Sequence, residues 1–224
     1  MDNKPDNEVH VAPETSSERA RSVGRDWVAW TVLAVVLGLH AVQTYRLFPS
    51  WTAFIDDRPI LSVDHAIHLY HGYLGARFLR EHFTSWGYDP YFMAGYPKTP
   101  VYDSSSAPAE LAQFVAGGVY SPRAYKIGVA IMVLLSPVLL VVASWAYGAR
   151  PPSMTATAIW AVWYWWSGFP DALVRTGLVA FVWSSSVSVV VPALLSQWGT
   201  NPSWKRWMVL TVTATVGLQA HSLF

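Results

Sequence analysis

Apolar residues gather into long runs in the first quarter and the second half of the chain, whereas the part between them mixes aromatic, charged and turn-forming residues. Residues 27–48 form the first run. At about 1.5 Å per residue, its length of about 22 residues is enough to cross a hydrocarbon core of about 30 Å. Further runs cover about residues 125–147, 153–167, 172–197 and 204–224. The pattern predicts an all-α membrane protein with about five transmembrane helices. The run 153–167 is short for a span, so an interfacial helix is the alternative for it.

The segment 49–124 contains no run long enough to cross a membrane, and turn-forming residues are frequent in it, including Gly87, Pro90, Gly95, Pro97, Pro100 and Pro108. We expect a folded loop domain outside the bilayer. Within it, residues 62–83 carry apolar side chains at helical spacing, which predicts an amphipathic helix at the membrane surface. Residues 1–26 are polar and lack an apolar period, so they are expected to form a disordered tail.

Lys and Arg residues near the runs predict the orientation. They precede the first run and lie in the connections near residues 150 and 205, in the set Arg19, Arg21, Arg25, Arg150, Lys205 and Arg206. These parts are expected in the cytoplasm, which makes residues 49–124 extracytoplasmic in a multi-pass protein of the cell (cytoplasmic) membrane. The last run is still apolar at Phe224. We therefore expect a downstream portion of the same protein, or a partner subunit, to complete it.

Composition narrows the classes of function. Hydrophobic residues make up 53% and charged residues 13% of the chain, against roughly 25% charged residues in soluble domains. Membrane lipids are therefore the expected surroundings. Without cysteine, a metal could use only imidazole, carboxylate or carbonyl ligands. A net charge of +1 gives no electrostatic footprint for nucleic acid, and no glycine-rich phosphate loop is present.

Asp64, His68 and His71 lie at i, i+4 and i+7 on the predicted amphipathic helix and therefore share one face. Three interpretations are open. Asp64 and His68 are suited to catalysis as a carboxylate beside an imidazole. The three side chains together are suited to a divalent metal ion. An acid near a helix start is also an ordinary cap, and the histidines are then only amphipathic surface residues.

Two further groups are candidates for binding. Tyr91, Phe92 and Tyr96 belong to an aromatic, turn-rich stretch whose rings can pack on sugars or lipid headgroups, or can seal the loop domain against the bilayer. Asp171 and Arg175 are the only charged residues between Arg150 and Lys205. Charges at that depth usually face a cavity, but an acid at a helix start that pairs with Arg175 at i+4 is an equally simple interpretation.

Asp64 and His68 after the first span, with Asp89-Pro90-Tyr91, Gly95-Tyr96-Pro97 and Tyr102 further on, resemble the N-terminal part of a prokaryotic family of multi-span proteins. That family carries the label "6-pyruvoyl-tetrahydropterin synthase-related membrane protein", and its layout is similar to GT-C glycosyltransferases. Arg175-Thr176-Gly177 and His221 fit the family's general pattern. The family usually has a proline directly after the tyrosine that corresponds to Tyr102, whereas this chain has Asp103 there.

The resemblance implies a GT-C-like transferase that moves a sugar from a polyprenyl-phosphate-linked donor on the extracytoplasmic side, with Asp64 as the base. It implies that Arg175 holds the donor phosphate, with Lys98 and Arg77 as weaker candidates, and that the three aromatic residues wall the sugar. Competing acids are Asp56, Asp57, Asp89 and Asp103. This interpretation specifies no cofactor, and a divalent metal ion is the one candidate. The alternative is a non-catalytic membrane module that binds a lipid-linked glycan or scaffolds a partner.

Overall fold

A computed structural model of the chain describes residues 16–92, 94–99 and 103–221, with side chains from residue 26 onward. The described chain is mostly helical, as predicted. Its helices are α1 (Ser16–Tyr45), α2 (Trp51–Ile55), α3 (His65–His82), α4 (Ala107–Val115), α5 (Pro122–Ala146), α6 (Pro151–Trp166), α7 (Phe169–Thr176), α8 (Val179–Thr200) and α9 (Trp204–Ala220). A single turn, η1 (Ser104–Ser106), precedes α4, and β1 (Gly87–Asp89) pairs antiparallel with β2 (Tyr96–Lys98).

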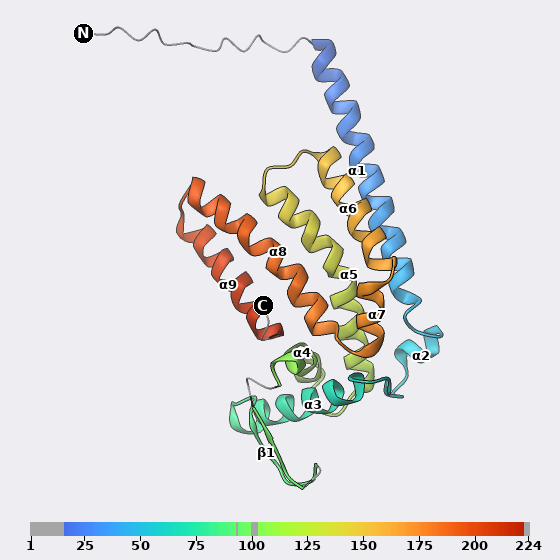
Figure 1. Cartoon of the computed structure of the whole chain (residues 1–224), viewed down its shortest axis with the longest axis vertical. Coiled ribbons are helices and arrows are strands. Elements are labelled where there is room, and N and C mark those ends of the chain that lie inside the picture. The colour runs from blue at the N-terminus through green and yellow to red at the C-terminus, as the bar shows by residue number, and fades with distance from the viewer. Residues whose placement is uncertain (1–15, 93, 100–102, 222–224) are drawn as a thin grey trace, which may run out of the picture.

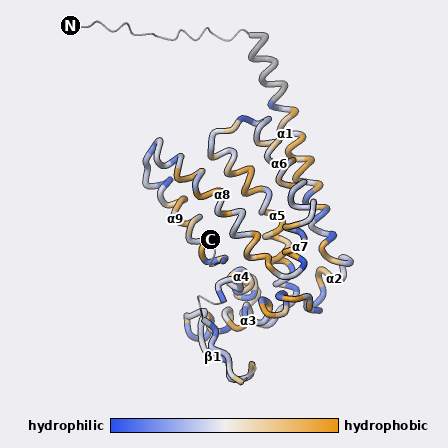
Figure 2. The backbone as a smooth tube through the Cα atoms, viewed as in Figure 1, coloured by the Kyte–Doolittle hydropathy of each residue, from blue (hydrophilic) through white to orange (hydrophobic). Residues whose placement is uncertain are grey.

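Helices α1, α5, α6, α8 and α9 form a bundle, and α3 and α4 lie across one end of it (Figure 1). Residues Asp26–Tyr45 of α1, together with α5 and α8, are long and apolar enough to cross a membrane. Helices α6 and α9 have 16 and 17 residues and are shorter. Figure 2 shows hydrophobic stretches along α1 and α5 and hydrophilic residues where α5 joins α6. The described chain therefore has three candidate spans.

Two predicted boundaries differ from the structure. Helix α1 begins at Ser16, so residues 16–26 of the expected disordered tail are helical. Glu18, Arg19, Ala20 and Arg21 all favour helix, which accounts for the extension. Residues 1–15 of the expected tail lie outside the described residues, as does Tyr102.

The predicted run 172–197 is two helices instead of one. Gly177 ends α7 with a φ of +101°, a conformation that residues with a side chain rarely adopt. The chain turns there before α8 begins at Val179. Asp171 and Arg175 consequently lie in the short helix α7, at the end of the bundle near α3, and not inside a long span.

The bundle has two distinct ends (Figure 1). The start of α1, the α5–α6 connection with Arg150, and the α8–α9 connection lie at one end, where α9 begins with Trp204 and Lys205. The segment with α2, α3, α4 and the hairpin lies at the other end. Arg150 and Lys205 are therefore separated from the loop domain by the length of the bundle.

A buried histidine connects three helices inside the bundle by bonding to a backbone carbonyl that a proline leaves without its helical partner. Pro137 lies within α5 and has no N–H to donate to the Val133 carbonyl one turn earlier. His40 of α1, which is 1% exposed, donates from Nε2 to that carbonyl at 3.0 Å. Its Nδ1 accepts a hydrogen bond from Trp166 Nε1 of α6 at 3.0 Å. One neutral imidazole thus satisfies the buried backbone group and joins α1, α5 and α6.

We expect His40→Leu to lower the free energy of unfolding by about 1–3 kcal/mol, because it leaves the Val133 carbonyl buried without a donor. In a Pro137→Ala background the restored backbone N–H at position 137 replaces the lost donor, so the cost of His40→Leu should shrink. The measurement is a double-mutant cycle of unfolding in detergent. His82→Leu, which changes an exposed histidine, is the control, with an effect within about 0.5 kcal/mol. Equal costs in both backgrounds would contradict the explanation.

Candidate functional site

The start of α3 is attached to the end of α7. The Asp64 backbone N–H donates to the Thr176 carbonyl at 2.9 Å, and the Ser62 hydroxyl donates to the Arg175 carbonyl at 2.8 Å. A Cβ atom at Gly177 would lie 2.5 Å from the His65 nitrogen, so a side chain there would collide with the backbone of α3. These contacts bring together the two segments that the sequence singled out around Asp64 and Arg175.

Asp64 is the one acid of residues 49–124 whose carboxylate has no hydrogen-bond or ion-pair partner in the described chain. It occupies the N-cap position of α3 without making the cap hydrogen bond. The other acids are all paired: Asp56 with Lys126 and Arg58, Asp57 with Arg123, Glu81 with Arg77, Asp89 with Tyr70, Asp103 with His71 and Tyr96, and Glu110 with Lys98. The competing acids Asp56, Asp57, Asp89 and Asp103 thus have structural partners, whereas Asp64 has a free carboxylate.

His68 lies one helical turn after Asp64. Its Nδ1 is joined to the Ser106 hydroxyl by a hydrogen bond of 3.0 Å, and its Nε2 has no partner among the described residues. Burial lowers the pKa of His68 to about 4, against the opposing effect of the Asp64 charge. The imidazole is therefore neutral at pH 7. We call Asp64, His68, Ser106 and the nearby His221, which ends α9, the Asp64–His68 corner.

His71 faces a different set of groups. Its Nδ1–H donates to Asp103 Oδ1 at 3.1 Å, and its ring stacks on Tyr96 with centroids 4.7 Å apart. Burial lowers its pKa, and its Nε2 is buried without a hydrogen bond. Over the ranges that the structure describes, no three His, Asp or Glu side chains are placed to hold a metal ion. Asp64, His68 and His71 are therefore not grouped as a set of three ligands in the described chain.

The aromatic stretch packs on α3 instead of surrounding the corner. Phe92 stacks on Tyr70 with centroids 5.0 Å apart, and Tyr96 stacks on His71. The Tyr70 hydroxyl donates to Asp89 at 2.5 Å, which holds the hairpin against α3. Tyr91 is 90% exposed. Of the three aromatic residues expected to contact the sugar, Phe92 and Tyr96 pack the hairpin onto α3, and Tyr91 is exposed.

The three candidate phosphate ligands are paired with acids. Arg175 Nε contacts the two Asp171 carboxylate oxygens at 3.0 and 2.9 Å, as the simpler interpretation of the i+4 pair expects. The buried Lys98 ammonium contacts Glu110 and the Ser85 carbonyl. Arg77 Nε pairs with Glu81 at 2.9 Å. The segment of Arg175 is attached to the segment of Asp64 by the hydrogen bonds to the Arg175 and Thr176 carbonyls. The Arg175 side chain is 51% exposed.

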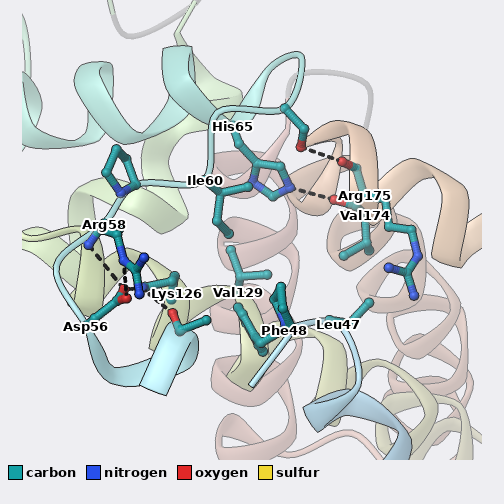
Figure 3. Close-up of a pocket in the computed structure, with 14 residues that line it drawn as sticks. Leu47, Phe48, Asp56, Arg58, Ile60, His65, Lys126, Val129, Val174 and Arg175 are labelled. Atoms are coloured by element: carbon teal, nitrogen blue, oxygen red, sulfur yellow. Dashed lines mark hydrogen bonds and ion pairs between the residues drawn. The ribbon is translucent and has the colours of Figure 1, made fainter. Parts of the chain in front are cut away.

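A cavity of about 410 Å³ lies beside the start of α3 (Figure 3). Asp56 and Lys126 are on one side of it, where the buried ammonium donates to Asp56 Oδ1 at 2.6 Å. Lys126 and Arg58 lower the pKa of Asp56 to about 2. His65 and Val174 are on the other side, and the Arg175 guanidinium points away from them. The cavity is lined by both apolar and charged residues, and Asp64 does not line it.

Sequence reasoning missed His65 and Lys126. His65 donates from Nε2 to the Val174 carbonyl at 2.8 Å and contacts the Tyr125 hydroxyl through Nδ1, also at 2.8 Å. It therefore joins α3 to α5 and α7. Lys126 also donates to the Ala53 carbonyl at 2.5 Å and holds α2 against α5. The available signal was a lysine close to the start of an apolar run, which needs a partner if it is buried.

No protein-family model, curated protein or solved structure matches the chain.

We expect stability to fall as the pH drops from about 6.5 to about 4. Burial lowers the pKa of His65, His68 and His71 in the folded protein, whereas an unfolded histidine takes up a proton near pH 6.5. The unfolded state therefore binds more protons over this window and is favoured by acid. Thermal unfolding in detergent between pH 7.5 and 4.5 measures the loss. His68→Gln should flatten the curve and the exposed-site variant His82→Gln should not; an unchanged slope in His68→Gln contradicts the assignment.

Proposed function

We propose that the chain is an integral membrane glycosyltransferase of GT-C type, which transfers a sugar from a polyprenyl-phosphate-linked donor on the extracytoplasmic side. The observation that carries the proposal is the carboxylate of Asp64, which has no partner among the described residues in a loop domain whose other acids are all paired. An unpaired carboxylate beside a neutral imidazole is suited to general base catalysis. The resemblance stated above adds the type of donor.

The arrangement of the bundle supports the proposed orientation. Under the proposal all five bundle helices cross the cytoplasmic membrane, with the N-terminus in the cytoplasm. Arg150 and Lys205 then lie on the cytoplasmic side, where positive residues are favoured. The loop domain lies at the opposite end of the bundle, so under the proposal Asp64 is on the extracytoplasmic side together with the lipid-linked donor.

The chemistry requires one proton transfer and one displacement. Asp64 takes the proton of an acceptor hydroxyl, and the oxygen of that hydroxyl forms a bond to the anomeric carbon of the sugar. The bond from that carbon to the phosphate oxygen breaks, and the electron pair leaves with the phosphate. His68, neutral and one turn away, can hydrogen-bond to the acceptor or pass the proton onward. A cation must stabilise the departing phosphate, and Arg175 is suited to this when it exchanges Asp171 for phosphate oxygens.

The non-catalytic alternative has its own supporting observation. Arg175, Lys98 and Arg77 are each already paired with an acid, so a phosphate must compete with a carboxylate for any of them. A module that only binds a lipid-linked glycan needs no such exchange.

Asp64→Asn should lower glycan transfer in membranes by roughly 100-fold or more, because the amide cannot take the acceptor's proton. The assay follows incorporation of labelled sugar from a polyprenyl-linked donor, with expression and helicity measured alongside. Glu81→Gln is the matched control, since Glu81 is a half-exposed carboxylate of the same loop domain and should leave transfer unchanged. Full transfer by Asp64→Asn removes Asp64 from the mechanism.

Arg175→Gln and Asp171→Asn separate phosphate binding from a purely structural pair. If Arg175 binds phosphate, Arg175→Gln should raise the KM for the donor by roughly tenfold. Asp171→Asn should lower that KM, since the guanidinium no longer has to leave a carboxylate. A structural pair predicts instead that both variants reduce stability alike and leave the KM unchanged. Steady-state kinetics with varied donor concentration distinguish the two results.

A further inference from the structure

The cavity of about 410 Å³ beside the start of α3 is separate from the proposed base, because Asp64 does not line it. It lies at the ends of two candidate spans. Leu47 and Phe48 line it and follow the candidate span Asp26–Tyr45. Lys126 also lines it and lies near the start of α5, a second candidate span. When these helices are in a bilayer, the cavity is therefore at the level of the lipid headgroups.

The cations that line this cavity outnumber its one acid. The Asp56 carboxylate is shared by Lys126 Nζ and Arg58 Nε, each at 2.6 Å. Arg175 is the third cation, but it is paired with Asp171 and lies across the cavity from Asp56 (Figure 3). On the side of Asp56, one negative charge therefore faces two positive charges.

Several hydrogen-bond donors on that side lack an acceptor. A lysine ammonium has three N–H groups, and the Ala53 carbonyl and Asp56 take two of those of Lys126. Arg58 uses Nε for Asp56, and its two terminal nitrogens have no partner among the described residues. His65, on the other side, adds no charge at pH 7, because burial lowers its pKa. A ligand with several anionic oxygens, such as phosphate, supplies the missing acceptors.

Much of the remaining lining is apolar. Ile60, Val129 and Val174 line the cavity together with Leu47 and Phe48. Free phosphate leaves these side chains in contact with water, whereas a phosphate ester that carries hydrocarbon contacts both parts of the lining. The excess of cations favours a headgroup with net negative charge, because the ammonium of a choline headgroup adds a positive charge beside those already present.

We propose that this cavity binds the phosphate group of an anionic bilayer phospholipid of the phosphatidylglycerol type. Arg58 and Lys126 donate to the phosphate oxygens, and the apolar residues of the lining contact the first part of the acyl chains. Basic pockets between membrane helices are a known form of headgroup site. The inference goes beyond the proposed function, since it needs neither Asp64 nor a sugar donor.

Native mass spectrometry of the purified full chain in detergent tests the proposal. The chain is titrated with phosphatidylglycerol, phosphatidylcholine and glycerol phosphate. Wild type should bind one phosphatidylglycerol, and it should bind phosphatidylcholine roughly tenfold more weakly. Glycerol phosphate has the headgroup chemistry without the hydrocarbon, so it should not displace the bound lipid at equal concentration.

Three variants locate the site. Arg58→Gln should weaken phosphatidylglycerol binding by roughly tenfold, because it removes donors and a charge; the Arg58 side chain is 82% exposed, so the fold does not depend on it. Asp56→Asn should strengthen binding, because the cations lose the carboxylate that competes with phosphate. Arg123→Gln is the matched control. It removes the same charge from a half-exposed arginine that is paired with Asp57 and does not line the cavity, and it should bind lipid like wild type.

Each contrary result overturns the proposal. Equal binding of the two phospholipids does so, and so does equal weakening in Arg58→Gln and Arg123→Gln, which indicates general attraction to a basic surface. Weaker binding by Asp56→Asn with helicity intact also contradicts it. Displacement of the lipid by glycerol phosphate at equal concentration assigns the cavity to a water-soluble phosphate ester instead. Asp64→Asn should bind phosphatidylglycerol like wild type, so the result of the transfer assay does not affect this test.

Discussion

The position of the candidate site depends on the contact between the start of α3 and the end of α7. The backbone bond from Asp64 to Thr176 and the missing side chain at Gly177 let the two helices meet closely. His65, the next residue, extends this contact by bonding to the carbonyl of Val174. Because these bonds involve the backbone and a buried imidazole, they hold the segment around residue 64 without using the Asp64 carboxylate. That carboxylate makes no cap hydrogen bond of its own.

The Asp64 carboxylate differs from most charged groups of this fold, which are paired. Removing a charge from water is costly, so a buried charge needs a partner. Lys98 and Lys126 illustrate the rule, since each is 2% exposed and bonded to an acid and a backbone carbonyl. Inside the bundle, His40 satisfies a carbonyl that Pro137 leaves free. Among the described residues, the ring nitrogens His71 Nε2 and Trp165 Nε1 are buried without a hydrogen bond, but Asp64 is the one acid of the loop domain without a partner.

The sequence predicted the helical class, the apolar runs and the helix around residues 65–82, because these follow from local periodicity. It also selected Asp64 and Arg175 as candidate residues, through the resemblance and the scarcity of charge in the second half, but it did not predict the backbone contact between their segments. It could not predict which acids would be paired. The partners of Asp103 and Asp56, for example, are His71 and Lys126, and these pairs depend on how separate elements pack. The division of the run 172–197 had a local signal in Gly177, but the surrounding apolar residues favoured a continuous helix.

The fold contains two hollows of opposite character. The cavity beside α2 has charged residues in its lining, including the Lys126–Asp56 pair, whereas the groove between α4, α5, α8 and α9 is lined mostly by apolar residues. The contact between α3 and α7 belongs to the first of them, because His65 and Val174, which are joined by a hydrogen bond, both line the charged cavity. The contact that fixes the position of residue 64 therefore also forms one side of that cavity.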